Sequence, residues 1–291
     1  TGRMSAEEPS VQNWPKRDGE AREVRKPIVA DKDCMIIAVD YGQIAARVIA
    51  MYTKDKTFCK MLWENYDIHA EWARRLATAY PDRIGGKENL SDKKVMKDFR
   101  TDIKNQWTFP LVFGATVPSV SGYLHIPEEI VKQQFNVFWN QFSGIKEWQE
   151  ELMKFYRLNG YVETFTGRRR RGPLSPNKVY NSPVQGVTAE IVMEAFCRLS
   201  EIGDPVLQAE LNIHDDLTFL RVPAKRVDHY LEKIIDVMIQ PPFDFINVPI
   251  SLEASVGENW LDMEEVGTYD SHKWNIDYHR HREKTGFKLA A

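Results

Sequence analysis

Two short apolar runs that lie far apart in the chain each lead into an aspartate. Residues 35–39 (MIIAV) come directly before Asp40, and residues 211–213 (LNI) are followed by His214 and Asp215. Apolar runs of this length are typical of buried strands, and most of the sequence between them has helical spacing. Strands in both terminal thirds with helices between them predict an antiparallel sheet interrupted by a helical insertion, an α+β fold.

Hydrophobic periodicity and turn residues predict the remaining elements. Residues 1–33 are polar and lack a clear period, so we expect an irregular segment there. We expect strands at 34–40, 161–165 and 248–256, helices at 43–52, 182–202 and 226–239, a tight hairpin of 211–213 with 217–220, and a mostly helical stretch from 68 to 156 broken at Pro81, Gly85, Gly86, Pro110, Pro118 and Pro127.

The composition excludes several classes of protein. A net charge of -3 over 291 residues does not by itself indicate a nucleic-acid partner, although basic residues cluster at 93–104 and 168–171. The three cysteines lack metal-binding spacing, which argues against a disulfide framework and a zinc site. No secretory signal or membrane-spanning apolar run is present. We therefore expect a soluble protein in the cytoplasm of a bacterium or of a phage-infected host, with an organelle as the alternative.

Asp40 and Asp215 indicate a metal-dependent site if the sheet brings them together. Two carboxylates supply the hard oxygen ligands that Mg²⁺ prefers. A pair of such ions about 3.5–4 Å apart activates the attacking oxygen and stabilises the leaving oxygen in phosphoryl transfer. The alternative for either aspartate alone is a turn residue or a helix N-cap.

Further motifs accompany these aspartates in a fixed order. The segments are TGRMS (1–5) with Pro9, Gln12, Asn13, Pro15 and Arg17; DYGQI (40–44) with Arg47; Arg100 and Lys104 with Phe113 and Gly114; GYVET (160–164); GRRR (167–170); NSPVQG (181–186); and HDD (214–216). Together they resemble the polymerase domain of family A DNA polymerases, the family of bacterial DNA polymerase I and phage replicases. The resemblance covers nearly the whole chain, and seven matches in order are far more specific than any one.

The resemblance implies a palm sheet interrupted by mostly helical fingers, with residues 1–66 and 179–291 in the palm and 67–178 in the fingers. In this family a thumb, and often a 3′→5′ exonuclease, precede the TGR segment, so we expect both to lie outside this chain. A trimmed chain would explain this. So would a split polymerase whose second chain carries the thumb and possibly the exonuclease.

The implied activity is template-directed DNA synthesis. A primer 3′-hydroxyl attacks the α-phosphorus of a deoxynucleoside triphosphate (dNTP), and pyrophosphate is released. The implied partners are primer-template DNA and dNTPs, and the implied cofactor is a pair of Mg²⁺ ions, with Mn²⁺ as a substitute. The implied metal ligands are Asp40, Asp215 and the main-chain carbonyl of Tyr41, with Asp216 nearby.

A second set of residues is implied to bind the nucleotide. Arg100 and Lys104 are spaced i, i+4, which places both cations on one helical face. Lys104 is also implied to take part in catalysis; the alternative for the pair is an exposed basic face without a ligand. The full set is His69, Arg100, Lys104, Phe109, Phe113, Gln43 and Ala45.

A third set is implied to contact DNA. Asn181 and Gln185 are spaced i, i+4, and their amides suit the minor-groove acceptors present in every base pair. The alternative for Asn181 is helix capping by it or by Ser182. The full set is Arg3, Gln12, Asn13, Arg17, Asn181, Gln185, His214, Arg168 and Arg169. The arginine run is expected near the template backbone or in a solvated loop, and His214 near the primer terminus or as an ordinary strand-end histidine.

The chain departs from the family pattern at two functional places. One extra residue follows Lys104, so that either Thr108 or Phe109 takes the place of the base-stacking aromatic. Because an extra residue rotates the rest of a helix by about 100°, we predict a π-bulge or kink between about Asn105 and Pro110. The second departure is paired: Ala45 replaces the usual glutamate and Phe113 the usual tyrosine, which implies weaker rejection of ribonucleotides.

Two rival functions stay open at this point. One is a single-subunit RNA polymerase or a ribonucleotide-tolerant relative, which shares the two-aspartate arrangement. The other is a catalytically idle, polymerase-like DNA-binding module. The set Asp40, Asp215, Arg100 and Lys104 argues against the idle module, which has no use for all four.

Overall fold

The computed structural model describes residues 2–15 and 19–271. The chain divides into two compact units, one formed by Thr1–Val48 with Gln185–Ala291 and the other by Ile49–Val184. The divisions fall inside two helices, α1 (Ile44–Thr53) and α9 (Pro176–Glu201). The palm and fingers boundaries at 66/67 and 178/179 stay predictions.

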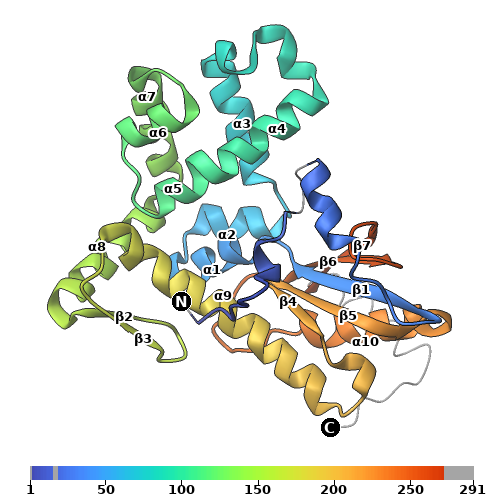
Figure 1. Ribbon diagram of the computed structural model, residues 1–291. Coiled ribbons are helices and arrows are strands. Elements are labelled where there is room, and N and C mark those ends of the chain that lie inside the picture. Colours follow the sequence, from blue (N-terminus) through green and yellow to red (C-terminus); the bar gives the residue numbers. More distant parts are fainter. Residues whose placement is uncertain (1, 16–18, 272–291) are drawn as a thin grey trace. The chain divides into compact units, whose positions relative to one another are not determined.

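The first unit contains an antiparallel sheet, whose strands within the described residues have the order β4-β5-β1-β6-β7 (Figure 1). The strands are β1 (Cys34–Tyr41), β4 (Leu211–Ile213), β5 (Asp216–Pro223), β6 (Ser251–Gly257) and β7 (Glu264–Asp270). Strand β1 is central because Ile36, Ile37 and Val39 are fully buried on its two faces. The antiparallel sheet interrupted by a helical insertion is confirmed.

One face of this sheet is covered by α10 (Val227–Ile239), which contacts β1, β5, β6 and β7 (Figure 1). The helix is amphipathic, and Ile234, Ile235 and Met238 are buried. Burial of each such side chain contributes roughly 1.5–3 kcal/mol. The remaining short elements of the unit are the 3₁₀ turns Val11–Asn13, Glu20–Arg25, Pro205–Leu207 and Ala224–Arg226.

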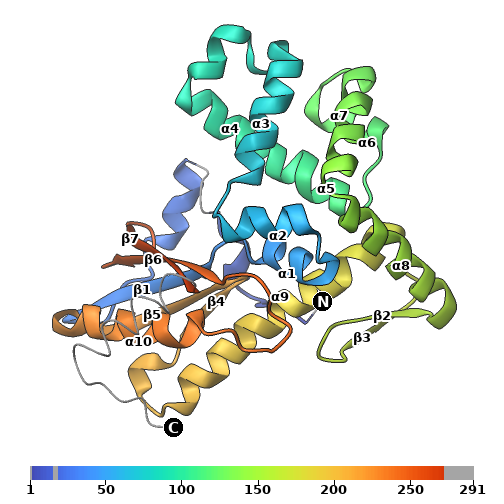
Figure 2. The same ribbon diagram turned by 180° about the vertical axis from the view of Figure 1, so that it is seen from behind.

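The second unit is mostly helical. Its helices are α2 (Lys56–Trp63), α3 (Ile68–Ala79), α4 (Lys93–Ile103), a π-helix (Lys104–Thr108), α5 (Phe109–Val112), α6 (Val117–Leu124), α7 (Glu128–Gln141) and α8 (Ser143–Asn159), with 3₁₀ turns at Pro81–Ile84 and Lys87–Ser91. Helices α3 and α4 lie side by side, and a hairpin of β2 (Tyr161–Glu163) and β3 (Arg169–Arg171) follows α8 (Figure 2). Trp72, Trp107 and Phe138 form the centre of the core, with ring centroids 5.3–6.1 Å apart.

Several predictions from the sequence were wrong in detail. Pro110 does not break the helix, because it directly follows the π-helix, whose wider turn already interrupts the i→i−4 hydrogen bonds. Helix α9 begins at Pro176 rather than 182 and continues through Pro183. The strand predicted at 161–165 ends at Glu163, and the strand predicted at 248–256 begins only at Ser251. Strand β7 was not predicted.

Candidate active site

The sheet brings the two acidic motifs together. In the pairing of β1 with β5, Asp40 lies opposite Asp216, and the amide of Tyr41 donates to the carbonyl of Asp215 over 3.1 Å. His214 and Asp215 form the two-residue turn between β4 and β5, in which His214 has a φ of 63°. The register therefore places Asp40 and Asp215 at one edge of the sheet, as the strand-end pattern predicts.

The segment after Asp40 is held from several sides. The hydroxyl of Tyr41 donates to the carbonyl of Met238 over 2.9 Å, and burial raises the pKa of Tyr41. Arg47 is buried and donates to the carbonyls of Gly42 (2.9 Å) and Pro249. Burial lowers the pKa of Arg47 to about 10, so the guanidinium stays charged near neutral pH. The C-terminal end of β1 is thereby fixed in position, as a precise arrangement of metal ligands requires.

The sequence did not reveal a third acidic residue on this face. Glu253 lies opposite Asp40 on β6 and is exposed. Residues that face each other across strands share a face of the sheet, so Asp40, Asp216 and Glu253 lie on the same side. Within the part of the chain that is described, no group of three or more His, Cys, Asp or Glu side chains is arranged to hold a metal ion. The predicted ligand set instead combines two carboxylates with a main-chain carbonyl, all hard oxygen donors that suit Mg²⁺.

The N-terminal segment reaches the same hairpin. The side chain of Gln12 donates to the carbonyls of Asn212 on β4 (3.1 Å) and Met4 (3.0 Å). Asn13 instead donates to Ser10 at 2.8 Å, and Arg3 is half-buried. Gln12 thus lies beside the turn that carries Asp215, while Arg17 lies outside the described residues.

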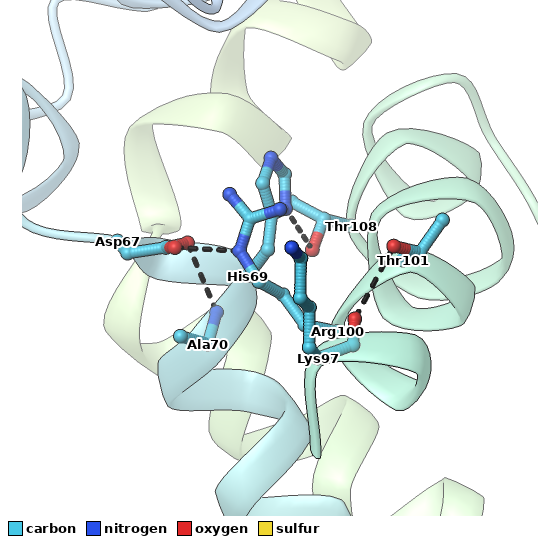
Figure 3. Close-up of polar contacts among 7 residues, drawn as sticks. All are labelled: Asp67, His69, Ala70, Lys97, Arg100, Thr101 and Thr108. Atoms are coloured by element: carbon cyan, nitrogen blue, oxygen red, sulfur yellow. Dashed lines mark hydrogen bonds and ion pairs between the residues drawn. The ribbon is translucent and has the colours of Figure 1, made fainter. Parts of the chain in front are cut away.

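A basic cluster forms separately in the second unit. Arg100 on α4 donates from Nε to Asp67 at 2.5 Å, and the same carboxylate caps α3 by accepting from the amide of Ala70 at 3.0 Å (Figure 3). Burial opposes ionisation of Asp67, but the bonds from Arg100 and Ala70 prevail and lower its pKa. The sequence did not reveal this ion pair, which holds the Arg100 side chain against the start of α3.

His69 lies beside this pair and is buried. Its Nδ1 shares a hydrogen bond of 3.2 Å with the hydroxyl of Thr108 (Figure 3), and its ring centroid lies 5.5 Å from that of Phe109. Burial and the charge of Arg100 lower the pKa of His69 from 6.5 to about 4, so the ring is neutral at pH 7. Its Nε2 atom is buried without a hydrogen-bond partner among the residues described.

The extra residue after Lys104 is accommodated by a π-helix, which confirms the predicted bulge. Residues Lys104–Thr108 are π-helical, and the amide of Phe109 donates to the carbonyl of Lys104, five residues back. Trp107 and Thr108 are buried, whereas Phe109 is half-buried and stacks on Phe113 with centroids 6.2 Å apart. The wider turn places Phe109 one turn beyond Lys104. Of the two alternatives, the structure favours Phe109 over Thr108 as the aromatic on the face of Arg100 and Lys104.

Deleting Asn105 should convert this π-helix into an α-helix and leave the fold intact. Asn105 is exposed, and its removal restores the four-residue spacing from Lys104 to Phe109 without changing the order of residues that enter the core. We expect the free energy of unfolding to change by less than about 1 kcal/mol.

Deletion of Thr101 in α4 is the matched control, because it rotates the residues between the deletion and the π-helix by about 100°. Even if the π-helix absorbs the lost residue, Ile103 leaves the core and Lys104 takes its buried position. That variant should lose more than about 3 kcal/mol. Thermal unfolding, followed by circular dichroism, measures the change in stability of both deletion variants. Equal losses in the two deletions would show that Asn105 is not the accommodated residue.

The lowered pKa of His69 makes stability depend on pH. Between pH 6.5 and about 4 the unfolded chain binds a proton at His69 that the folded chain does not, so stability falls as the pH falls. Between pH 7 and about 5.5 the loss is on the order of 1 kcal/mol. The loss should be absent in His69→Gln and present in His229→Gln, which alters an exposed histidine. Measuring the unfolding midpoints between pH 7 and about 5.5 tests this prediction. It would be contradicted if stability varied with pH in the same way in the wild type and in His69→Gln.

The last three residues of the arginine run, Arg169–Arg171, form strand β3 and not a loop. Arg169 pairs with Glu163 across the β2–β3 hairpin and lies over the ring of Tyr161 at 4.6 Å. Arg170 donates to the hydroxyl of Ser182 at 3.0 Å. Arg168 is exposed. A solvated loop is therefore excluded for Arg169–Arg171, and a role in DNA contact stays a prediction for Arg168 and Arg169.

The amides of α9 lie inside the helix. Because α9 begins at Pro176, neither Asn181 nor Ser182 can be its N-cap, and the capping alternative is wrong. Asn181 and Gln185 are half-buried and one helical turn apart, while Ser182, Pro183 and Val184 between them are buried. The two amides thus share one accessible face of α9, as minor-groove contacts would require.

Comparison with known proteins identifies the family. The sequence model of the family described as DNA polymerase family A matches residues 1–262. The chain belongs to DNA polymerase family A. The match contains Asp40, Asp215 and the basic cluster of the second unit, and it fits the order of motifs in the sequence.

Members of DNA polymerase family A similar to this chain include two bacterial enzymes. DNA polymerase I of Chloroflexus aurantiacus is 29% identical over 276 residues, which make up 90% of this chain and 28% of that protein. The thermostable DNA polymerase I of Thermus aquaticus is 28% identical over 282 residues, 91% of this chain and 32% of that protein. The chain thus spans about a third of the length of these relatives.

A solved structure has the same fold. The POL domain of Pol1 from M. smegmatis, in complex with DNA primer-template and dNTP, superposes with a TM-score of 0.73. It is 23% identical, and the match covers 89% of this chain and 46% of that one.

Within residues 2–15 and 19–271, no helix has the length and apolar character needed to cross a bilayer.

Proposed function

We propose that this chain is the catalytic core of a template-directed DNA polymerase. It would add deoxynucleotides to a primer 3′-hydroxyl, forming a bond from the 3′-oxygen to the α-phosphorus and breaking the bond to the β-phosphate, with pyrophosphate as the leaving group. The observation that carries the proposal is the strand register that joins Asp40 and Asp215 at one sheet edge, with the amide of Tyr41 on the carbonyl of Asp215. Family membership supports the same reaction.

The residues that would hold Mg²⁺ are Asp40, Asp215 and the carbonyl of Tyr41. Two divalent ions, when bound there, would stabilise the negative charge on the attacking and leaving oxygens. The rigid anchoring of Tyr41 and Arg47 would keep these oxygen ligands in place, because their hydrogen bonds tie the end of β1 to Met238, Gly42 and Pro249.

The basic cluster of the second unit would bind the triphosphate. Arg100 and Lys104 supply positive charge, and the ion pair with Asp67 orients the Arg100 guanidinium while leaving its Nη groups for phosphate oxygens. When Thr108 donates to Nδ1 of the neutral His69, Nε2 carries the proton and can donate to a phosphate. Phe109 would support the base or sugar, and Lys104, the first residue of the π-helix, would neutralise charge on the departing pyrophosphate.

Primer-template DNA is the proposed partner, which the M. smegmatis polymerase domain binds together with a dNTP. Gln12 beside the β4–β5 turn, His214 in that turn, and Asn181 with Gln185 on α9 are the proposed duplex contacts. Arg3, Asn13, Arg168 and Arg169 complete the proposed set. A second chain that supplies the thumb stays a prediction, tested by adding a separately made thumb-containing fragment.

Primer extension tests the proposed function directly. A labelled primer on a longer template is incubated with the chain, Mg²⁺ and dNTPs, and the products are resolved by length. We expect templated extension that needs both dNTPs and a divalent cation. Extension with ribonucleotides alone would favour the RNA polymerase alternative. Tight DNA binding without any metal-dependent extension, with and without the thumb fragment, would favour the idle module.

A further inference from the structure

A pocket of about 310 Å³ in the second unit adjoins the basic cluster proposed to bind the triphosphate. It is lined by α3, the 3₁₀ turn Lys87–Ser91 and the beginning of α4, which lie side by side in Figure 1. Arg100 belongs both to the basic cluster and to this lining. The other residues of the lining have no role in the chemistry proposed above.

The pocket is lined by four cations. Arg74 comes from α3, and Lys93, Lys97 and Arg100 come from α4. From Lys93 the cations follow at i+4, i+7 and i+11, the last being Lys104, so they fall on one face of the helix. Figure 3 shows the side chains of Lys97 and Arg100 extending toward the same side of α4. The row of positive charge that starts at Lys104 and Arg100 therefore continues for about two more helical turns.

The added cations are not neutralised within the part of the chain that the structure describes. No ion pair there involves Arg74, Lys93 or Lys97, and all three side chains are exposed. Arg75, by contrast, is paired with Glu71 at 2.7 Å. Like charges one helical turn apart repel each other and destabilise a helix. A bound anion would remove this repulsion.

One carboxylate lies in the lining, and it is already bound. Asp92 is the N-cap of α4, and its Oδ1 accepts from the amides of Lys94 (2.8 Å) and Val95 (3.0 Å). The positive end of the helix dipole partly offsets its charge. Four cations against one capped carboxylate leave the pocket positive, so its chemistry favours an anion.

The remaining walls offer no stacking surface for a nucleobase. Ala70, Leu90 and Met96 are half-buried, and none of the described residues that line the pocket is aromatic. The helix rises about 4.5 Å from Arg100 to Lys97 and about 6 Å from Lys97 to Lys93. Cations spaced in this way can contact successive phosphates of one chain, which Lys binds as a point charge and Arg through its planar fork.

We propose that this pocket binds the phosphates beyond the third of a nucleoside polyphosphate, such as a deoxynucleoside tetraphosphate. Arg100 and Lys104 hold the first three phosphates as they would in a dNTP, and Lys97, Lys93 and Arg74 bind the added part of the chain. The proposal rests on the proposed function for the position of the nucleotide, because Arg100 belongs to both sites.

Equilibrium binding without catalysis tests the proposal. Isothermal titration calorimetry in metal-free buffer gives Kd for deoxyadenosine triphosphate and tetraphosphate, and the first Kd divided by the second is the chain-length ratio. We expect a wild-type ratio of at least about five. Lys97→Glu and Arg74→Glu should each bring the ratio close to about one, because each removes an attraction and adds a repulsion for the added phosphate.

Lys94→Glu is the matched control. Lys94 is exposed and adjoins Lys93, but it points about 100° away around the helix and lies outside the lining. The variant changes the net charge as much as Lys97→Glu does, yet it should keep the wild-type ratio. Lys97→Arg retains the positive charge and should keep it as well. If Arg74→Glu fails to fold, Lys97→Glu decides alone, because its side chain is exposed.

Inorganic tripolyphosphate distinguishes a free phosphate chain from a nucleotide. If tripolyphosphate bound in a Lys97-dependent way while the nucleotides gave a ratio of one, the pocket would take a free chain and the proposal would be wrong. A ratio that Lys97→Glu and Lys94→Glu lowered equally would also overturn it.

None of these measurements depends on catalysis. A chain with the expected ratios that fails to extend primers would refute the proposed function and keep the pocket. A chain that extends primers, with a ratio of one, would do the reverse.

Discussion

Replacing Asp40 or Asp215 by asparagine should lower the single-turnover rate of nucleotide addition at least about a thousandfold, or about 4 kcal/mol of barrier. Asparagine keeps the size of the side chain and one oxygen but removes the negative charge that a divalent cation needs. Both residues lie at the edge where Tyr41 and Asp215 are hydrogen-bonded, so either loss acts on the same small region. Affinity for primer-template should stay nearly unchanged, because neither aspartate is a proposed duplex contact.

Glu253→Gln is the control for these substitutions. Glu253 lies opposite Asp40 on β6 and is exposed on the same face, so the variant removes one negative charge without removing a proposed ligand. Its rate should stay within about tenfold of wild type. If both aspartate variants retained more than about a tenth of the wild-type rate, the two-carboxylate assignment would be wrong. An equal loss in Glu253→Gln would assign the effect to the summed charge of the face.

The parts of the structure that could be predicted are those with strong local signals. Strand β1 is a continuous apolar run, and α10 is clearly amphipathic, so both were located from the sequence within two residues. The π-helix could be predicted because the segment from Lys104 to Phe113 is one residue longer than the family motif that it resembles. A wider helical turn absorbs that extra residue.

The parts that could not be predicted depend on contacts between distant residues. Strand β7 has the sequence EEVGTYD, which lacks a clear apolar alternation, and it forms because β6 offers a free edge. The pairing of Asp67 with Arg100 and of His69 with Thr108 joins residues 33 and 39 positions apart, for which no spacing rule exists. The start of α9 was predicted too late because a proline such as Pro183 normally marks a helix end. The sequence does not show that burial of the neighbouring residues stabilises the helix on both sides of Pro183.

Restoring two side chains should sharpen the selection between deoxyribonucleotides and ribonucleotides. By resemblance, a family glutamate at the position of Ala45 packs against the sugar 2′ position, and a tyrosine hydroxyl at Phe113 holds it. Here Ala45 is half-buried in the first turn of α1, and Phe113 is half-buried at the end of α5 with its ring stacked on Phe109. Neither position is closed by packing, so both can accept the larger side chain with little cost to the fold.

We expect the double variant Ala45→Glu with Phe113→Tyr to raise the ratio of kcat/KM for dNTP over ribonucleotide about a hundredfold, or about 2.7 kcal/mol. Each single variant should gain less. Ala45→Glu alone lacks the hydroxyl that fixes the carboxylate, and Phe113→Tyr alone leaves that hydroxyl without its partner. Single-nucleotide incorporation assays give kcat/KM for a dNTP and for the matching ribonucleotide. They are made with the wild type, the two single variants and the double variant. The interaction between the two substitutions is the decisive quantity, because two independent size effects would simply add. A wild type that already rejects ribonucleotides strongly, with a ratio that the double variant leaves unchanged, would show that another side chain excludes the 2′-hydroxyl.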